Sequence, residues 1–446
     1  GGDSTSPLAP PPNTLVNNPA ADATTQDTQS ETTLVLGSGS NILASFNDSG
    51  SDIAPNASFT GIARSTNGGT SFTDQGRLPV SANSDAGDPV YARNNTTGRI
   101  ILATLSFNSA AALQSYRTDD DGATYQAPID CDGGGTNNDK EWITCDNFAG
   151  AGQGNFYNFY RDFGGGGGMS FVRTTDGGAT WGARVLLASG SGQGAWVTVG
   201  ANHTVYAFWL ASPNAIVLRR STDQGVTFSA QVTAQTLRTT GTNGDLALNG
   251  GMRSNAFPQV VASPTDANQL YMVWNDKGIS PSTDKSNVYF SQTTDGGTTW
   301  SPAVQVNTDA GLQDNWQPVI AITPDGTGLF VSWYDRRLDG ANSRINVFGR
   351  NATISGSTVT FGTDYRITDA DFPVVIGQDG VIVSTYMGDY DQAVADNTSY
   401  YRTWGDNRLS STAHTNQPDV RFTKIPKAGP GAALTAGAIA LTAENC

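Results

Sequence analysis

The sequence Thr174-Thr-Asp-Gly-Gly-Ala-Thr-Trp181 recurs along the chain with small changes. Each copy has Ser or Thr, then Asp or Asn two residues later, then Gly, then an aromatic residue. The other copies are Ser65-Thr-Asn-Gly-Gly-Thr-Ser-Phe72, Thr118-Asp-Asp-Asp-Gly-Ala-Thr-Tyr125, Ser221-Thr-Asp-Gln-Gly-Val-Thr-Phe228 and Thr293-Thr-Asp-Gly-Gly-Thr-Thr-Trp300. An oxygen that accepts backbone N–H bonds, a glycine that tolerates the left-handed conformation and a ring that packs on a sheet predict a β-hairpin turn. The chain is therefore expected to consist of repeated hairpins.

This pattern resembles the Asp-box, or BNR repeat, of the sialidase-like β-propeller superfamily. The resemblance extends over nearly the whole chain and implies an all-β propeller. It also implies that the Asp or Asn of each turn belongs to the scaffold and has no catalytic role. These structural positions are Asn67, Asp120, Asp176, Asp223 and Asp295.

Strand-like runs before each turn extend the repeat to seven units, each with an innermost strand. The expected innermost strands are 31–36, 88–92, 141–144, 195–199, 258–262, 317–321 and 391–395. Regular spacing of such units predicts a seven-bladed propeller of four-stranded blades, with six blades as the alternative. The last unit lacks a fourth strand, and Thr14-Leu-Val-Asn17 has the pattern of one, so the N-terminal strand should close the ring. We expect a linker or anchor at 1–13, one propeller domain at 14–426 and an Ala/Gly-rich tail at 427–446.

The charge balance limits the partners. The 446 residues include 25 Lys or Arg and 40 Asp or Glu, a formal net charge of −15. Such a chain repels phosphate backbones, which argues against nucleic acid and favours cations and neutral or cationic ligands. No run approaches the roughly 20 apolar residues of a transmembrane helix. The Pro- and Ser-rich start resembles a mature bacterial lipoprotein just after its lipidated cysteine, so an extracellular, cell-surface or periplasmic location is expected.

The chain has three cysteines. Cys131 and Cys145 flank a Gly-rich loop, and an exported protein is expected to join them in a disulfide. Cys446 is then left as a free thiol or as an intermolecular bridge in an assembly.

The ligand surface is expected on the face opposite the repeat turns. In a propeller, the loops after the second strands and the connectors into the innermost strands share that face. Acidic, basic and aromatic residues together are typical of a carbohydrate site. The expected ligand-binding residues are Glu141, Arg161, Trp274, Asp276, Trp333, Arg336, Arg337, Trp404 and Arg408. The alternative is structural, because a Trp-x-Asp strand end commonly packs its Trp between blades.

Asp389, Tyr390 and Asp391 are the leading catalytic candidates, followed by Asp335 and Asp406. Crowded carboxylates at a strand entry either raise a pKa enough for acid catalysis or bind a hard cation. In the second case Glu31, Asp88 and Asp391 would ligate Ca²⁺, and the sequence does not choose between the two. No organic cofactor is expected.

The sequence departs from the sialidase pattern. Those sialidases use an arginine triad, a Tyr/Glu nucleophile pair and an Asp acid, with an Arg-Ile/Leu-Pro motif before the first Asp-box and six blades. Here Arg77-Leu78-Pro79 follows the first repeat, and the expected innermost strands do not open with Arg. Classical sialidase activity is therefore not expected.

Three functions stay open. The first is an exported carbohydrate-directed propeller that binds glycans or cleaves them as a glycoside hydrolase or polysaccharide lyase. The others are a noncatalytic cell-surface protein-binding propeller and a structural or assembly component, because a fold does not imply a function.

Overall fold

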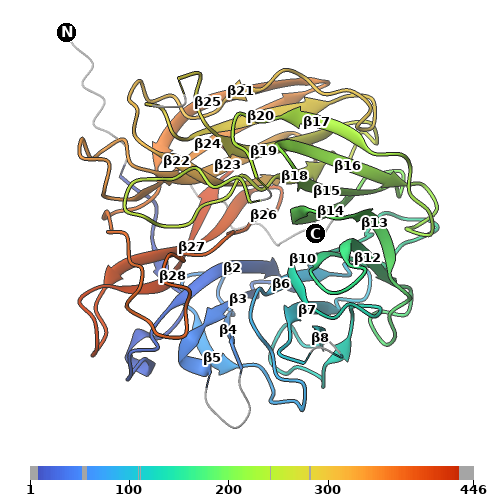
Figure 1. The fold of residues 1–446 in the computed structure, drawn as a ribbon, viewed down its shortest axis with the longest axis horizontal. Helices are drawn as coiled ribbons and strands as arrows, with labels where there is room; N and C mark the ends of the chain where they lie inside the picture. Colours follow the sequence, from blue (N-terminus) through green and yellow to red (C-terminus); the bar gives the residue numbers. More distant parts are fainter. Residues whose placement is uncertain are drawn as a thin grey trace.

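The computed structural model describes residues 9–430, except 53–57, 109, 111, 242, 281 and 282. Seven four-stranded antiparallel sheets stand around a central axis, which makes the chain a seven-bladed β-propeller (Figure 1). The seven-blade prediction is confirmed. No helix in the described part is long and apolar enough to cross a membrane.

The blades follow one another along the chain. Blades 1 to 3 are β2 (Gln29–Leu36), β3 (Ile42–Asp48), β4 (Thr60–Ser65) and β5 (Thr73–Arg77); β6 (Val90–Arg93), β7 (Ile100–Leu105), β8 (Leu113–Thr118) and β9 (Ile129–Asp130); and β10 (Asn138–Cys145), β11 (Phe156–Asp162), β12 (Gly168–Thr174) and β13 (Val185–Ser189). Blades 4 and 5 are β14 (Gly192–Val199), β15 (Val205–Ala211), β16 (Ala215–Ser221) and β17 (Val232–Thr236); and β18 (Gln259–Ala262), β19 (Leu270–Asp276), β20 (Asn287–Thr293) and β21 (Val304–Gln305). Blade 6 is β22 (Asn315–Ile322), β23 (Gly328–Asp335), β24 (Asn346–Ser355) and β25 (Thr358–Arg366).

Blade 7 joins the two ends of the described chain. Its order is β1 (Thr14–Leu15), β28 (Gln417–Pro426), β27 (Ser399–Leu409) and β26 (Ala393–Ala395), with Thr14 opposite Phe422. The predicted closure by the N-terminal strand is therefore seen. Two short 3₁₀ turns, η1 (Pro19–Ala21) and η2 (Ser49–Ser51), lie beside β2 and β3 in the chain.

The five repeat turns share one hydrogen-bond pattern. In the turn of blade 4, Ser221 Oγ accepts the Gly225 N–H at 2.8 Å and Asp223 Oδ1 accepts the Thr227 N–H at 2.9 Å. The Thr227 hydroxyl and backbone N–H groups lower the pKa of Asp223 to about 2. The carboxylate of this repeat thus accepts its hydrogen bonds from within its own turn, as a scaffold role requires.

Each repeat turn also packs against the preceding blade. Phe228 meets Phe171 edge to face, with ring centroids 4.8 Å apart, and Phe72 meets Phe422 in the same way at 5.1 Å. A Cβ atom added at Gly69, in the same turn as Phe72, would lie 2.1 Å from the Phe422 ring. The glycine therefore brings the turn backbone onto the neighbouring blade.

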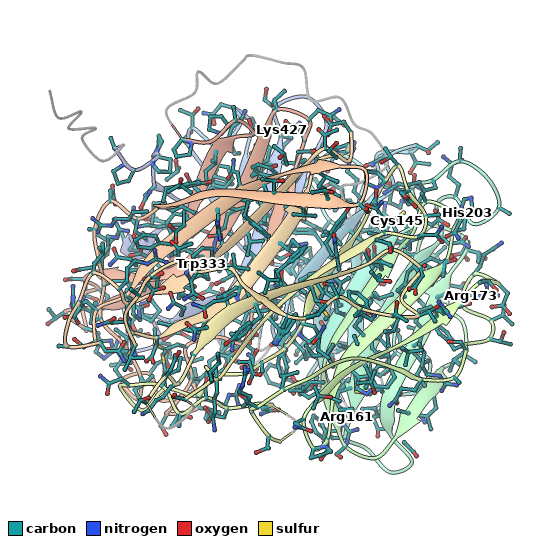
Figure 2. The ribbon with its side chains drawn as sticks, turned by 90° about the horizontal axis from the view of Figure 1, so that it is seen from above. Cys145, Arg161, Arg173, His203, Trp333 and Lys427 are labelled. Carbon is teal, nitrogen blue, oxygen red and sulfur yellow. The ribbon has the colours of Figure 1, made fainter. Side chains whose placement is uncertain are left out.

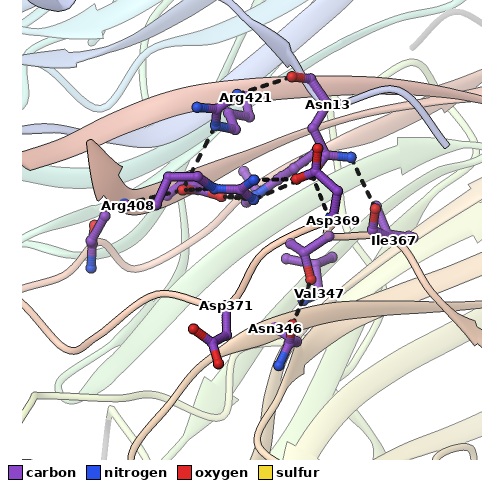
Figure 3. A network of polar contacts seen from close by, with 12 residues as sticks. Asn13, Asn346, Val347, Ile367, Asp369, Asp371, Arg408 and Arg421 are labelled. Carbon is purple, nitrogen blue, oxygen red and sulfur yellow. Dashed lines mark hydrogen bonds and ion pairs between the residues drawn. The ribbon is translucent and has the colours of Figure 1, made fainter. Parts of the chain in front are cut away.

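The seam between blades 6 and 7 is polar (Figure 3). Asn13 Nδ2 donates to the Ile367 carbonyl at 2.9 Å, and Arg421 donates to the Asn13 carbonyl at 3.0 Å. Arg408 bridges Asp406 and Asp369 at the same place. The segment just before β1 is thus tied to both blades.

The expected disulfide does not form. Cys131 follows the outermost strand of blade 2, whereas Cys145 ends the innermost strand of blade 3. They belong to different buried clusters, and in the described part of the chain no disulfide joins them. Closeness in sequence was misleading because the chain passes from the rim to the axis between them. Cys446 lies outside the described residues.

We predict that Gly69→Ala lowers the free energy of unfolding by about 2 kcal/mol more than Gly68→Ala, because only the first overpacks a blade contact. Gly68 and Gly69 both have positive φ, 71° and 87° respectively, but a Cβ at Gly68 would meet nothing within 4 Å. Urea unfolding of the two variants measures the difference. Equal losses would show that the turn does not bear on the preceding blade.

Candidate functional site at the channel mouth

Innermost strands of several blades begin with a bulge that turns one residue toward the axis. The register shifts between Ser30 and Thr33 in β2, and the corresponding shifts in β10, β14 and β22 follow the same plan. One residue at each of these bulges has positive φ, between 51° and 72°: Glu31, Lys140, Gly194 and Gln317. Asp88, just before the unbulged β6, also has positive φ, 53°. These strands run from the channel mouth toward the turn face, so the bulges lie at the mouth.

Acidic side chains of blades 1, 2, 3 and 7 meet there. Glu31 accepts the Asn47 amide at 2.8 Å and the Asp389 backbone N–H at 2.8 Å. Burial and the charge of Glu31 raise the pKa of Asp88 well above its usual range, and the same causes raise the pKa of Asp139. Buried carboxyls that repel one another retain protons. The structure thus brings Glu31 and Asp88 together, as expected, and adds Asp139.

Glu141 is fully buried beside this group. In the described part of the chain no other residue donates a hydrogen bond to its carboxyl oxygens, and burial raises its pKa well above the usual range. It is therefore expected to be protonated at neutral pH and does not offer a charge to a ligand.

Lys140 is the buried cation of the cluster. Its ammonium lies 4.7 Å from the ring centroid of Trp142 and 4.6 Å from that of Tyr390. Burial lowers its pKa, and the charges of Glu31 and Asp88 oppose that shift. Tyr390 is itself fixed, since its hydroxyl donates to the Pro89 carbonyl at 2.9 Å. Lys140 and Tyr390 thus form the floor of the mouth.

Asp389 is a partly exposed carboxyl of this group and lies beside a small hollow. Its side chain is 19% exposed and accepts from Arg253 Nη2 at 2.8 Å. Burial and Glu31 raise its pKa to about 7, although Arg253 opposes the rise. Asp389 and Lys140 line this hollow, and Arg253, Trp316 and Tyr386 line a neighbouring one. Each has room for about one water molecule.

Asp391 lies in a separate environment, so the expected pair of Asp389 and Asp391 is not a dyad. It accepts from Tyr334 at 2.6 Å, Thr32 at 2.8 Å and Gln317 at 3.2 Å. Burial raises its pKa to about 6, against the pull of buried Arg402. With all these bonds, Asp391 links blades 1, 6 and 7 and is not open to a ligand.

Asp335 and Asp406 occur in two copies of one structural motif. In Trp333-Tyr-Asp335-Arg-Arg337 the indole N–H donates to Asp335 at 2.9 Å, and Arg337 Nε donates to it at 2.8 Å. The segment Trp404-Gly-Asp406-Asn-Arg408 repeats both contacts, at 3.1 and 2.7 Å. These six side chains satisfy one another, so we assign them a structural role in place of the expected catalytic and ligand-binding roles.

The remaining expected ligand-binding residues are also engaged in the fold. Trp274 is buried and stacks on Tyr289, and Asp276 accepts four bonds from the residues around it. Arg336 is buried on Asp314 at 2.8 Å, and Arg161 donates to the Gly190 carbonyl. Of the predicted set, the structure brings Glu31, Asp88, Glu141, Asp389 and Tyr390 to the mouth.

No sequence pattern selects Asp139, Lys140 or Arg253 as a site residue. Asp139 and Lys140 directly precede Glu141 in β10. The bulge in β10 brings them to the mouth, and the sequence pattern does not show that bulge. Arg253 lies in the irregular segment between β17 and β18, which carries no repeat pattern. Within the described ranges no group of three or more His, Cys, Asp and Glu has the arrangement of a metal site. Calcium binding stays a prediction from the sequence.

Comparisons with known proteins return similar folds at low identity. No protein-family model and no curated protein sequence matches the chain. An intramolecular trans-sialidase from Ruminococcus gnavus is 14% identical, with 91% of this chain and 96% of that one covered and a TM-score of 0.47. An α-L-arabinofuranosidase from Fusarium graminearum is 11% identical, with 94% and 98% covered and a TM-score of 0.46. An ulvan lyase is 12% identical, with 78% and 83% covered and a TM-score of 0.47.

We predict that the stability difference between the wild type and Asp391→Asn depends on pH. A raised native pKa means that the wild-type carboxyl contributes most below about pH 4 and loses that contribution as the pH rises through about 6. The wild type should therefore lose about 2 kcal/mol relative to the variant between pH 4 and 7. Urea unfolding at each pH measures this. Asp245→Asn, at an exposed aspartate, is the control, and a constant difference for Asp391→Asn would contradict the assignment.

Proposed function

We propose that this chain is an exported carbohydrate-directed propeller that binds a glycan over the channel mouth and cleaves it with Asp389 as the proton donor. The observation that carries the proposal is a partly exposed carboxyl, at the edge of a small hollow, whose pKa is raised to about 7. Such a group is partly protonated at neutral pH and can protonate a glycosidic oxygen.

Aromatic residues lie around the mouth. Tyr386, which is partly exposed, and Trp316 line the hollow beside Arg253, and aromatic residues with a few polar groups are typical of sugar sites. The formal net charge of −15 over the whole chain repels anionic sugars, which favours a neutral or basic glycan as the substrate. The repeat turns, as Asp-boxes, supply only the frame.

The main test is an activity screen on the purified protein. Sialosides, neutral polysaccharides, amino-sugar polymers and uronate polysaccharides are incubated with and without Ca²⁺, and new reducing ends and unsaturated products are measured. We expect reducing ends from a neutral or basic polymer. A requirement for Ca²⁺ would assign the cation to Glu31 and Asp88, and unsaturated products would replace the hydrolase with a lyase.

We predict that Asp389→Asn lowers kcat by a factor of about 10² to 10⁴, because it removes the transferable proton. Wild-type activity should fall as the pH rises through about 7, as expected for an acid with that pKa. The control is Asp245→Asn, and circular dichroism checks that both variants fold. Unchanged kcat in Asp389→Asn would remove Asp389 from the mechanism.

The second candidate function is noncatalytic glycan binding, which the aromatic residues at the mouth favour. Affinity electrophoresis with the same polymers separates the two. Retardation without product would show that the protein binds glycans but does not cleave them. The Trp316→Ala variant should then lose this retardation. If no polymer gave product and none retarded the protein, the carbohydrate assignment would be overturned.

A further inference from the structure

The connector between β17 and β18 reaches Asp389 from outside the blade to which Asp389 belongs. Two of its side chains make the contact. Arg253 Nη2 donates to Asp389 Oδ2 at 2.8 Å, and Asn255 Nδ2 donates to the Asp389 carbonyl at 2.7 Å. On the other side, the Asp389 N–H donates to Glu31 Oε1 at 2.8 Å. Residue 389 is therefore held at three atoms: the N–H by blade 1, and the carbonyl and the carboxylate by the connector.

Arg253 is itself fixed in place. Its backbone N–H donates to the Thr385 carbonyl at 2.6 Å, and its guanidinium lies 4.9 Å from the ring centroid of Tyr386. Met252, directly before it, is buried in one cluster with Phe372. The guanidinium thus approaches Asp389 from a segment that is anchored by its backbone, by an aromatic ring and by a buried neighbour.

The two carboxyl oxygens of Asp389 have different surroundings. Oδ2 accepts from Arg253, whereas in the described part of the chain no side chain or backbone group donates to Oδ1. The Asp389 side chain is 19% exposed. A guanidinium has donors only, so it cannot bind a carboxyl oxygen that carries the proton as its acceptor. The protonated form of Asp389 is therefore expected to have its proton on Oδ1.

We propose that Arg253 is a positioning residue that keeps the transferable proton on Oδ1 of Asp389 and stabilises the carboxylate after the proton has left. In that step the Oδ1–H bond breaks, the proton goes to the glycosidic oxygen, and the electron pair stays on Oδ1. The negative charge then lies on a carboxylate that Arg253 already binds through Oδ2. This role rests on the proposed function, whereas the effect of Arg253 on the Asp389 carboxyl is measured without a substrate.

Arg253 is the cation that donates to the Asp389 carboxylate. Burial, Glu31 and Asp139 raise the pKa of Asp389 to about 7, and Arg253 opposes the rise. Without the guanidinium, the carboxyl should keep its proton to a higher pH. The other titratable groups around Asp389 are Glu31 on β2, Asp88 before β6, Asp139 and Lys140 on β10, and Tyr386 and Tyr390 of its own segment.

Infrared titration of the protonated-carboxyl band tests the proposal on the ligand-free protein. In each background, the Asp389 component is the part of the band that Asp389→Asn removes. We expect Arg253→Met to raise the pH midpoint of this component by about one unit or more, because a neighbouring positive charge is lost. The component should also move to higher wavenumber, since its carbonyl oxygen Oδ2 loses a charged donor. Arg253→Lys keeps the charge and should shift the midpoint by less than about half a unit.

Arg99→Met is the matched control. Arg99 follows β6 on the turn face and pairs with Asp119 at 2.8 Å, the same distance as in the pair of Arg253 and Asp389. In Figure 2, Lys427 and Cys145 lie toward the turn face and Arg161 toward the mouth face. The control removes the same charge far from the mouth, so it should leave the Asp389 midpoint unchanged.

Circular dichroism checks that each variant folds, and Arg253→Gln replaces Arg253→Met if the latter does not. A midpoint that moves no further than in the control would overturn the proposal. Equal shifts in Arg253→Met and Arg253→Lys would overturn it as well, because the charge would then not be the cause. An unchanged wavenumber would contradict the placement of the proton on Oδ1. A polymer screen without product would overturn the proposed cleavage, and the infrared midpoint would still decide whether Arg253 controls the carboxyl.

Discussion

The structure depends on the contact between each repeat turn and the blade before it. Ser221 and Asp223 fix the turn from within, and Gly225 and Phe228 press it onto Phe171 of blade 3. A Cβ atom at Gly225 would lie 2.4 Å from that ring, so the glycine sets how closely the blades approach. A four-stranded blade alone has two open edges and little core. Because the contact is repeated from blade to blade, it joins units of low individual stability into a closed ring.

Closing the ring determines where chemistry can occur. Innermost strands of all seven blades enter from the same face, so every bulge at a strand entry turns its residue toward one point. Asn47 shows how neighbouring entries are joined, because it donates to Glu31 and accepts the Asp88 N–H at 2.6 Å. Crowding carboxyls in this way raises their pKa values and concentrates proton-holding groups at the mouth.

Much of the fold could be predicted because it follows from local pattern. The turn signature and the apolar runs located all seven innermost strands, and Thr14-Leu15 was found because the last blade lacked a strand. The site was only partly predictable. Trp333, Asp335 and Arg337 were expected to face a ligand, but residues two apart lie on the same side of a strand and here bind one another. Lys140 and Arg253 depend on a bulge and an irregular segment, which no periodicity reveals.

The central claim is that the channel mouth retains carboxyl protons at neutral pH, with Asp389 as a partly exposed member of the group. Infrared difference spectroscopy of the protonated-carboxyl band, with the wild type and Asp389→Asn compared at pH values on either side of 7, tests this directly. The account predicts a band at pH 6 that weakens by pH 8 and that is smaller in the variant at pH 6. A wild type without this band at pH 6, or a band unchanged by Asp389→Asn, would contradict it.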